Sequence, residues 1–141
     1  MLEAGLLCLA LTIYHEARGE PVQGQKAVAV VVLNRSRERK LTVCQVIAQK
    51  GQFAWVSEKQ IMGTNRKPNP NKLPVGDSWE KSKRLAKEVW SSRKILGNIT
   101  YFHHKKETPY WGRTKEKVMI VGNHVFYREP RNVSRSSKNL A

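Results

Sequence analysis

The sequence predicts an α+β fold in which a helical lobe lies beside a small antiparallel β-sheet. The helix signals come first along the chain, and the strand signals come after about residue 95. The clearest strand signal is Gly122-Asn123 between two apolar runs, which is typical of a two-residue β-hairpin. Helices and strands that occupy separate parts of a chain form α+β domains. The 141 residues are expected to form one such domain over 1–127, followed by a basic, disordered tail over 128–141.

The first predicted helix ends near Glu16. Apolar residues from Leu6 to Ile13 recur at spacings of three and four, which indicates a helix with one buried face. Gly19 and Pro21 stop this helix, so Glu16 is expected on its last turn, beside a buried wall. The run also looks superficially like a signal sequence. No basic residue precedes it and no small-residue cleavage site follows, so we expect a core helix and no signal peptide.

A long second helix is predicted from about Val22 to Arg39. Residues 27–33 are almost wholly apolar, and their β-branched content would also fit a buried strand. The polar residues on both sides favour one helix that is buried in its middle. Thr42 can cap a short third helix that ends at Gly51. Residues 52–56 are then interpreted as a short strand or extended piece.

The middle of the chain alternates between loop and helix. Three prolines and two glycines fall among Asn and Lys residues in 63–76, which predicts a loop long enough to be functional. Asp77 with Glu80 three residues later matches a capping box, and the helix that it opens is expected to run to about Arg93. Residues 95–104 are interpreted as a turn and a strand that lead towards the hairpin.

The two cysteines, Cys8 and Cys44, lie on apolar stretches. We interpret them as small core residues of a reduced protein, and a disulfide between them is the less favoured alternative. No apolar run reaches the ~18 residues of a membrane span, so no transmembrane segment is expected. The domain is expected to be a monomer.

The net charge is +15, from 26 Lys and Arg against 11 acidic residues. Such a chain is drawn to polyanions, which include nucleic acid, anionic lipid and the anionic polymers of a bacterial envelope. Charge alone does not choose among them. Only one acid, Asp77, is an aspartate, so clustered-aspartate magnesium sites are excluded. This weakens polymerase-like and many nuclease functions.

Glu16 is the first candidate for chemistry. Desolvation beside a buried wall would raise its pKa, as a general acid requires. A structural ion pair with Arg18 or Arg35 is the alternative, and these residues alone leave the two interpretations about equally favoured. His15-Glu16 also begins the zinc-protease motif His-Glu-x-x-His, but Gly19 stands where the second histidine is needed. We therefore predict no metal site and no other cofactor.

Aromatic side chains gather in the strand and loop half of the chain. A protein that binds a sugar polymer needs aromatic faces for stacking, with Gln, Asn and His side chains nearby. Aromatic residues in small sheets are usually part of the core, so about half of these side chains are expected to be buried and structural. They are Phe53, Trp55, Tyr101, Phe102, Trp111 and Tyr127.

With Glu16 and these aromatics, the sequence resembles the cell-wall hydrolase family that includes the catalytic domains of spore-cortex-lytic enzymes. The matching blocks fall in the family's order and cover about Leu6 to Tyr127, and the Glu-Ala-Arg-Gly-Glu block is the most specific. The family often has serine or threonine where this chain has Ala54, so a hydroxyl role there is absent. The blocks are Glu16–Pro21, Gly24-Gln25, Ala27–Ala29, Val32–Arg35, Gln52–Trp55, Tyr101–His103 and Ile120–Tyr127.

The resemblance implies a lysozyme-like fold that cleaves peptidoglycan glycan strands between N-acetylmuramic acid and N-acetylglucosamine, with Glu16 as the catalytic acid. A single glutamate favours lytic transglycosylase chemistry with 1,6-anhydro-muramyl products, and hydrolysis by a muramidase is the alternative. Glu20 is the nearby candidate for a second carboxylate, but Gly19 separates it from the helix of Glu16, and we interpret it as structural, paired with a basic neighbour. The predicted substrate-binding residues are Gln25, Asn34, Phe53, Trp55, Tyr101, His103, Trp111 and His124.

Two further expectations concern partners. The sequence shows no separate peptidoglycan-binding domain and no signal peptide, which is more like a bacteriophage lysis protein, made in the host cytoplasm and acting on the wall. Its basic patches and tail would adhere to the anionic envelope. The alternative function is a basic nucleic-acid-binding protein, either non-catalytic or nuclease-like. The ordered match around Glu16 favours the enzyme, because charge does not explain it, so no specific nucleic acid is expected as a partner.

Overall fold

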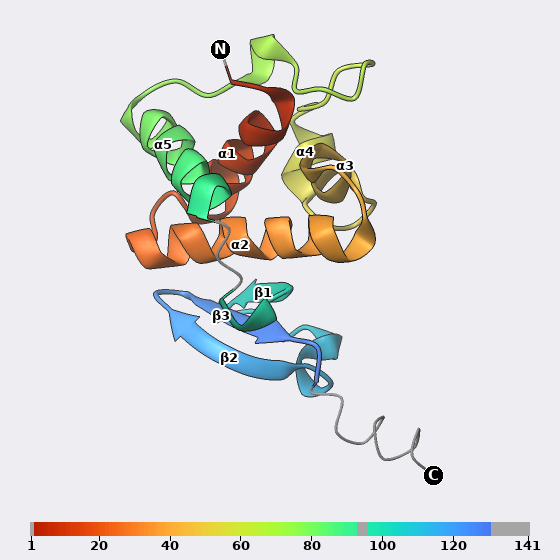
Figure 1. Cartoon of the computed structure of the whole chain (residues 1–141), viewed down its shortest axis with the longest axis vertical. Helices are drawn as coiled ribbons and strands as arrows, with labels where there is room; N and C mark the ends of the chain where they lie inside the picture. Colours follow the sequence, from red (N-terminus) through yellow and green to blue (C-terminus); the bar gives the residue numbers. More distant parts are fainter. Residues whose placement is uncertain (1, 93–95, 131–141) are drawn as a thin grey trace.

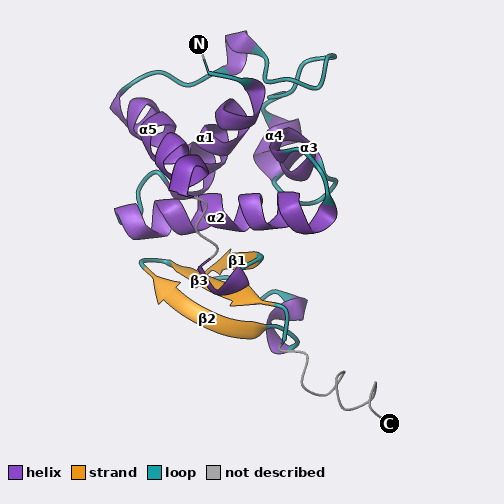
Figure 2. Cartoon of the chain, viewed as in Figure 1, coloured by secondary structure: helices purple, strands orange, loops and turns teal. Residues whose placement is uncertain are grey.

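The computed structural model describes residues 2–92 and 96–130. In this part of the chain, a helical lobe and a three-stranded sheet lie on opposite sides of helix α2 (Figures 1 and 2). The predicted α+β class is therefore confirmed. The helices are α1 (Ala4–Ala17), α2 (Val22–Arg39), α3 (Val43–Ala48), α4 (Ala54–Glu58) and α5 (Asp77–Ser92). The strands are β1 (Tyr101–His104), β2 (Glu116–Val121) and β3 (His124–Arg128), and the short 3-10 helices are η1 (Pro70–Lys72), η2 (Leu96–Asn98) and η3 (Tyr110–Arg113).

Helix α2 is buried all round in its middle because it separates the two layers (Figure 1). Each of residues 27–32 is at most 1% exposed. On one side α2 contacts α1, α3 and α5, and on the other it contacts β1 and η2. A helix that is apolar on every side needs such complete cover. The valines, whose branched side chains favour strands, are therefore held in a helix by tertiary packing.

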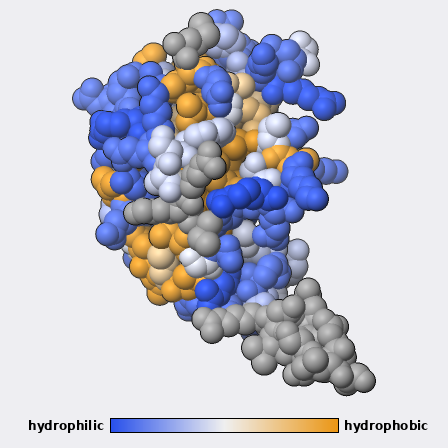
Figure 3. All heavy atoms as spheres, viewed as in Figure 1, coloured by the Kyte–Doolittle hydropathy of each residue, from blue (hydrophilic) through white to orange (hydrophobic). Residues whose placement is uncertain are grey.

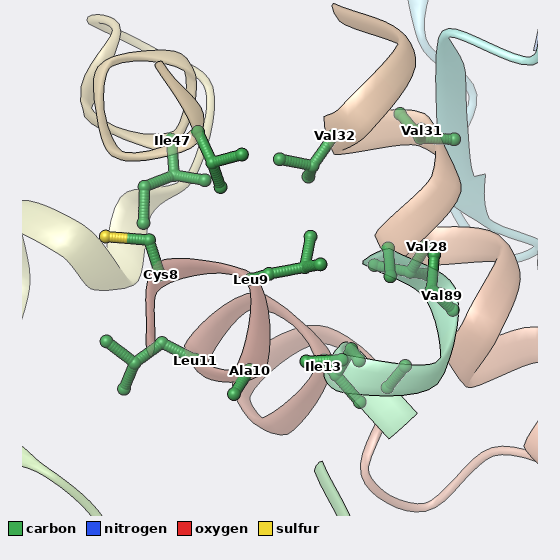
Figure 4. Close-up of a cluster of buried hydrophobic side chains, with 14 of the residues drawn as sticks. Cys8, Leu9, Ala10, Leu11, Ile13, Val28, Val31, Val32, Ile47 and Val89 are labelled. Atoms are coloured by element: carbon green, nitrogen blue, oxygen red, sulfur yellow. The ribbon is translucent and has the colours of Figure 1, made fainter. Parts of the chain in front are cut away.

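The core of the helical lobe forms around Leu9 of α1. Val28 and Val32 of α2, Ile47 of α3 and Val89 of α5 surround it, and all five side chains are at most 3% exposed (Figure 4). Burying a side chain of this size contributes roughly 1.5–3 kcal/mol. This packing fixes α1 in the lobe and so determines where its last turn lies.

The sheet has the order β1-β3-β2, and both strand pairs are antiparallel. Gly122 and Asn123 form the turn between β2 and β3, as predicted. Gly122 has a φ of 57°, in the left-handed region that glycine enters without steric cost. Phe126 of β3 is fully buried and joins the sheet to the core.

Most helix boundaries follow the sequence signals. The predicted second helix matches α2, and Thr42 caps α3 through a capping box with Gln45. Helix α3 ends at Ala48, before Gly51. Helix α5 includes Asp77 as its first residue, so Asp77 is not a cap that precedes the helix.

One element and one boundary were predicted wrongly. Residues 52–56 were interpreted as a short strand or extended piece. Phe53 is extended, but Ala54–Glu58 form helix α4. A helix of five residues is too short to show a periodic pattern. Arg128, assigned to the tail, belongs to β3, and its side chain donates to Glu116 at 2.8 Å. The remainder of the predicted tail, residues 131–141, lies outside the described residues.

The cysteines also differ from the prediction. Cys8 of α1 and Cys44 of α3 form a disulfide, with Cα atoms 5.4 Å apart. The apolar surroundings of each cysteine gave no sign that α1 and α3 pack against each other. The bond closes a chain segment of 36 residues, and such crosslinks typically stabilise a domain by ~2–4 kcal/mol.

The surface of the domain is mainly polar, with a few exposed apolar side chains. Figure 3 shows hydrophilic residues over much of the helical lobe and an apolar area on the side of the sheet. The most exposed large apolar residues are Tyr110 at 93%, Val75 at 88% and Ile120 at 61%. Among the described helices, none has both the length and the apolarity required to cross a bilayer.

Candidate active site

Glu16 lies on the last turn of α1, as predicted, and lines a pocket between the helical lobe and the sheet. The pocket has a volume of about 380 Å³. Its walls come from α1, α2, the residues before α4, β1, the β1–β2 connection and β3. The fold therefore brings side chains more than a hundred residues apart around one carboxyl group, as with Glu16 and His124.

The pKa of Glu16 is raised above its ordinary value. Burial is the largest cause, and a hydrogen bond from Trp55 opposes it. The negative charge of Glu107 raises the pKa further, whereas the positive charge of Arg35 lowers it. A carboxyl group with a raised pKa keeps its proton nearer to neutral pH, which is the property of a general acid.

Trp55 holds Glu16 in place. Its Nε1–H donates to Glu16 Oε2 at 2.9 Å. The indole is 7% exposed and stacks between His15 at 4.5 Å and Phe53 at 5.6 Å, measured between ring centroids. Burial, with the charges of Lys59 and Arg18, lowers the pKa of His15 to about 4, so this histidine is neutral at neutral pH.

The alternative reading of Glu16, a structural ion pair, is not found. Arg18 donates to Tyr14 O at 3.1 Å and lies over the Tyr14 ring. Arg35 is buried and donates to Thr100 O at 2.7 Å and to Gln52 Oε1 at 2.8 Å. Both guanidinium groups thus have other partners, and neither forms a salt bridge with Glu16 in the described chain.

Five of the eight predicted substrate-binding residues lie at the pocket. Phe53, His103, Trp111 and His124 line it, and Trp55 reaches it through its bond to Glu16. A sixth, Tyr101, lies beside the pocket, with its ring 5.1 Å from that of Trp111.

The other two predicted residues lie elsewhere. Gln25 is 1% exposed and donates to Glu20 O at 2.8 Å. Asn34 is 6% exposed and donates to Ile99 O at 2.9 Å. Neither lines the Glu16 pocket. Both sit on α2 and satisfy backbone carbonyls, so their amides are used to join parts of the fold.

The histidines on the strands meet at the pocket but do not form a metal centre. His103 Nε2 is 2.9 Å from Tyr127 Oη, and the rings of His104 and His124 lie 5.9 Å apart. In the residues that the structure describes, no group of three or more His, Cys, Asp or Glu side chains is arranged to hold a metal ion.

Glu20 does not line the pocket. The predicted pairing with a basic neighbour is wrong for the described residues, because the partner of Glu20 is Asn123. Its Oε1 accepts from Asn123 N at 2.7 Å, and its Oε2 accepts from Asn123 Nδ2 at 3.0 Å. Burial alone would raise the pKa of Glu20, but these bonds outweigh it and lower the pKa. Glu20 therefore joins the α1–α2 turn to the β2–β3 hairpin, and we call this contact the Glu20–Asn123 clasp.

Glu107 is a carboxylate that the sequence reading missed. It lines the Glu16 pocket from the β1–β2 connection, and its Oε1 accepts from His104 N at 2.8 Å. No motif surrounds it, and only the folded path of this connection brings it near Glu16. If a second carboxylate takes part in the chemistry, Glu107 is the one that the pocket offers.

Replacing Glu107 is expected to lower the pKa of Glu16. The charge of Glu107 disfavours the ionised form of Glu16, so Glu107→Gln removes one cause of the raised pKa. NMR titration of the Glu16 side-chain carboxyl carbon measures the change. Glu58→Gln, at the exposed last residue of α4, removes the same charge away from the pocket and should leave the titration unchanged. Equal shifts in both variants, or none in Glu107→Gln, would contradict the assignment.

The helical lobe, the small sheet and the glutamate that ends α1 together define a lysozyme-like domain. The model of a family described as "Cell Wall Hydrolase" matches residues 19–127 of this chain. The chain therefore belongs to the cell wall hydrolase family, which confirms the resemblance noted in the sequence and the prediction of an enzyme. The matched region begins at Gly19, shortly after Glu16, and so covers the clasp and most of the pocket.

Relatives with curated names point the same way. The spore cortex-lytic enzyme of Oceanobacillus iheyensis is 33% identical over 122 residues, which are 84% of this chain and 39% of that protein. The spore cortex-lytic enzyme of Bacillus subtilis is 30% identical over 121 residues, again 84% of this chain but 35% of that protein. The chain thus spans well under half the length of these relatives.

Solved structures share the fold. The catalytic domain of the germination-specific lytic transglycosylase SleB from Bacillus anthracis superposes with a TM-score of 0.70 at 28% identity, over 91% of this chain and 97% of that domain. The catalytic domain of the Bacillus cereus SleB protein gives a TM-score of 0.69 at 29% identity, over 89% of this chain and 90% of that one. Both matches support the predicted lysozyme-like architecture.

Proposed function

We propose that this domain cleaves the glycan strands of peptidoglycan between N-acetylmuramic acid and N-acetylglucosamine, with Glu16 as general acid and then base. The observation that carries the proposal is the position of Glu16, which lines the pocket with a raised pKa and accepts a hydrogen bond from the Trp55 indole. The family and the names of the relatives support the choice of substrate.

In the first step, protonated Glu16 gives its proton to the glycosidic oxygen. The bond from that oxygen to C1 of the muramyl sugar breaks, and positive charge develops on the ring as an oxocarbenium-like state. Because Trp55 donates to Oε2, the proton of the acid is carried on the other oxygen, Oε1. The indole bond also keeps the carboxyl group from rotating.

In the second step, ionised Glu16 accepts the proton of the muramyl 6-hydroxyl. The hydroxyl oxygen then bonds to C1, which gives a 1,6-anhydro ring and consumes no water. This lytic transglycosylase route needs one carboxylate, and the Glu20–Asn123 clasp keeps Glu20 away from the pocket. The second candidate is hydrolysis, which is favoured by one observation, the presence of Glu107 in the same pocket.

Mass spectrometry of the products distinguishes these routes. Digestion of purified peptidoglycan should release anhydro-muropeptides, each lighter by one water than the hydrolytic product. Under the single-glutamate route, Glu107→Gln and Glu20→Gln should leave the product unchanged. Each should lower turnover only modestly. Hydrolytic products, with a loss of turnover in Glu107→Gln as large as in Glu16→Gln, would instead establish a two-carboxylate hydrolase.

A further inference from the structure

A second hollow adjoins the Glu16 pocket on the side of the sheet. Its volume is about 740 Å³, and it shares His103, Glu107 and Pro109 with the pocket. The two hollows therefore adjoin each other. We call this second hollow the side groove, and its floor and rim come from β1, η3, β2 and β3.

The side groove is lined by cations whose charges are not neutralised. Lys105, Arg113 and Lys117 lie on its walls with exposed side chains, and none forms an ion pair within the described chain. They come from three different segments, so the fold and not one basic run of sequence gathers them. Against these three cations the lining contains one acid, Glu107.

The nearby acids that could have balanced this charge are already engaged. Glu116 pairs with Arg128 at 2.8 Å, and Glu129 pairs with Lys115 at 2.8 Å. The groove also carries Tyr110, which is 93% exposed and offers an aromatic face beside the cations. Positive charge with an open apolar surface suits a ligand that is both anionic and partly hydrocarbon.

The chemistry of the substrate identifies such a ligand. N-acetylated sugars are neutral, and the lactyl carboxyl of a peptide-bearing strand is held in the amide bond to the stem. The anionic groups of such a strand are therefore the carboxylates of its stem peptide. The lactyl arm that carries the stem branches from the muramyl sugar whose C1 would lie at Glu16. We infer that the side groove binds the stem peptide, with Lys105, Arg113 and Lys117 facing its carboxylates, so that the enzyme prefers peptide-bearing strands. This inference rests on the proposed function, because it places the muramyl sugar in the pocket.

The test measures binding of two glycan preparations. One carries intact stem peptides, and an amidase has removed the stems from the other, which leaves only the short lactyl carboxylate on each muramyl sugar. Both are titrated against protein that carries Glu16→Gln, so that no strand is cut. Adding Lys105→Gln, Arg113→Gln and Lys117→Gln should weaken binding to peptide-bearing strands by about three- to tenfold, since exposed ion pairs contribute little each. Binding to stripped strands should change little, and the loss should shrink as salt is raised.

A matched variant controls for total charge. Lys72→Gln, Arg84→Gln and Lys87→Gln remove the same number of exposed cations, and none of these residues lines the pocket or the side groove. This variant should bind both preparations as the parent does. Equal melting temperatures among all proteins show that the fold is kept.

The remaining outcomes overturn the inference. They are equal losses of binding on peptide-bearing and stripped strands, no loss on either, or a larger loss on stripped strands. Because binding is measured without turnover, the result does not depend on catalysis. If wild-type protein fails to cut either preparation, the proposed function is wrong. The ratio of the affinities for peptide-bearing and stripped strands still decides the role of the side groove.

Discussion

Glu16→Gln is expected to lower turnover on peptidoglycan by ~10²- to 10⁴-fold while the fold is kept. The glutamine has the shape of the glutamate, and its amide oxygen can still accept the bond that Trp55 now donates to Oε2. What is lost is the proton for the leaving group and the base for the second step. The measurement is the rate of soluble muropeptide release, taken together with a thermal melt of the same protein.

The matched control for Glu16→Gln is Glu20→Gln, which makes the same chemical change on the clasp and not in the pocket. Its turnover should fall far less, although its melting temperature should drop because the Asn123 bonds weaken. A folded Glu16→Gln protein that keeps more than about a tenth of wild-type turnover would remove Glu16 from the mechanism.

Gly122→Ala is expected to destabilise the domain by about 3 kcal/mol. Gly122 has a φ of 57°, where a side chain costs roughly 1–2 kcal/mol. A Cβ there would also meet Pro21 Cδ at 2.8 Å and would overlap Glu20 Oε1. Glu20 must then move, which breaks at least one of its two bonds to Asn123. Urea unfolding measures the loss as a lower midpoint at unchanged slope.

Gly51→Ala separates the two contributions to this loss. Gly51 also has a positive φ, 78°, but a Cβ there would meet nothing within 4 Å. Gly51→Ala should therefore lower the free energy of unfolding only by the cost of a side chain at positive φ, roughly 1–2 kcal/mol. If both variants unfold at the same urea concentration, the clasp contributes nothing to stability and its geometry is incidental.

The parts of the fold that could be predicted are those with long or strongly punctuated local signals. The α2 boundaries, Val22 and Arg39, follow from a long apolar segment with polar flanks, and the hairpin follows from Gly122-Asn123. Helix α4 could not be found in this way, because an aromatic run of this length fits a strand equally well. Tertiary contacts decide it: Trp55 is buried against His15 and Phe53.

For the candidate site, the position of Glu16 could be predicted from the sequence, but its surroundings could not. Glu16 was proposed because it lies on the last turn of an apolar helix, inside a specific block. Glu107 was not found, because a connection without any motif carries it to the pocket. Gln25 lies in a matching block, but its amide donates to the Glu20 carbonyl and does not line the Glu16 pocket.

The position of α2 between the two layers has a consequence for engineering. One helix supplies the packing surface for both layers. Towards the helical lobe, Val28 and Val32 of α2 pack against Leu9 (Figure 4). Towards the sheet, Asn34 of α2 donates to the Ile99 carbonyl, and Gly24 lies against Val121. If the sheet of a relative replaced the sheet of this chain, it would therefore pack against an α2 face that does not match it. Functional chimeras of this family should exchange α2 together with the sheet, or neither.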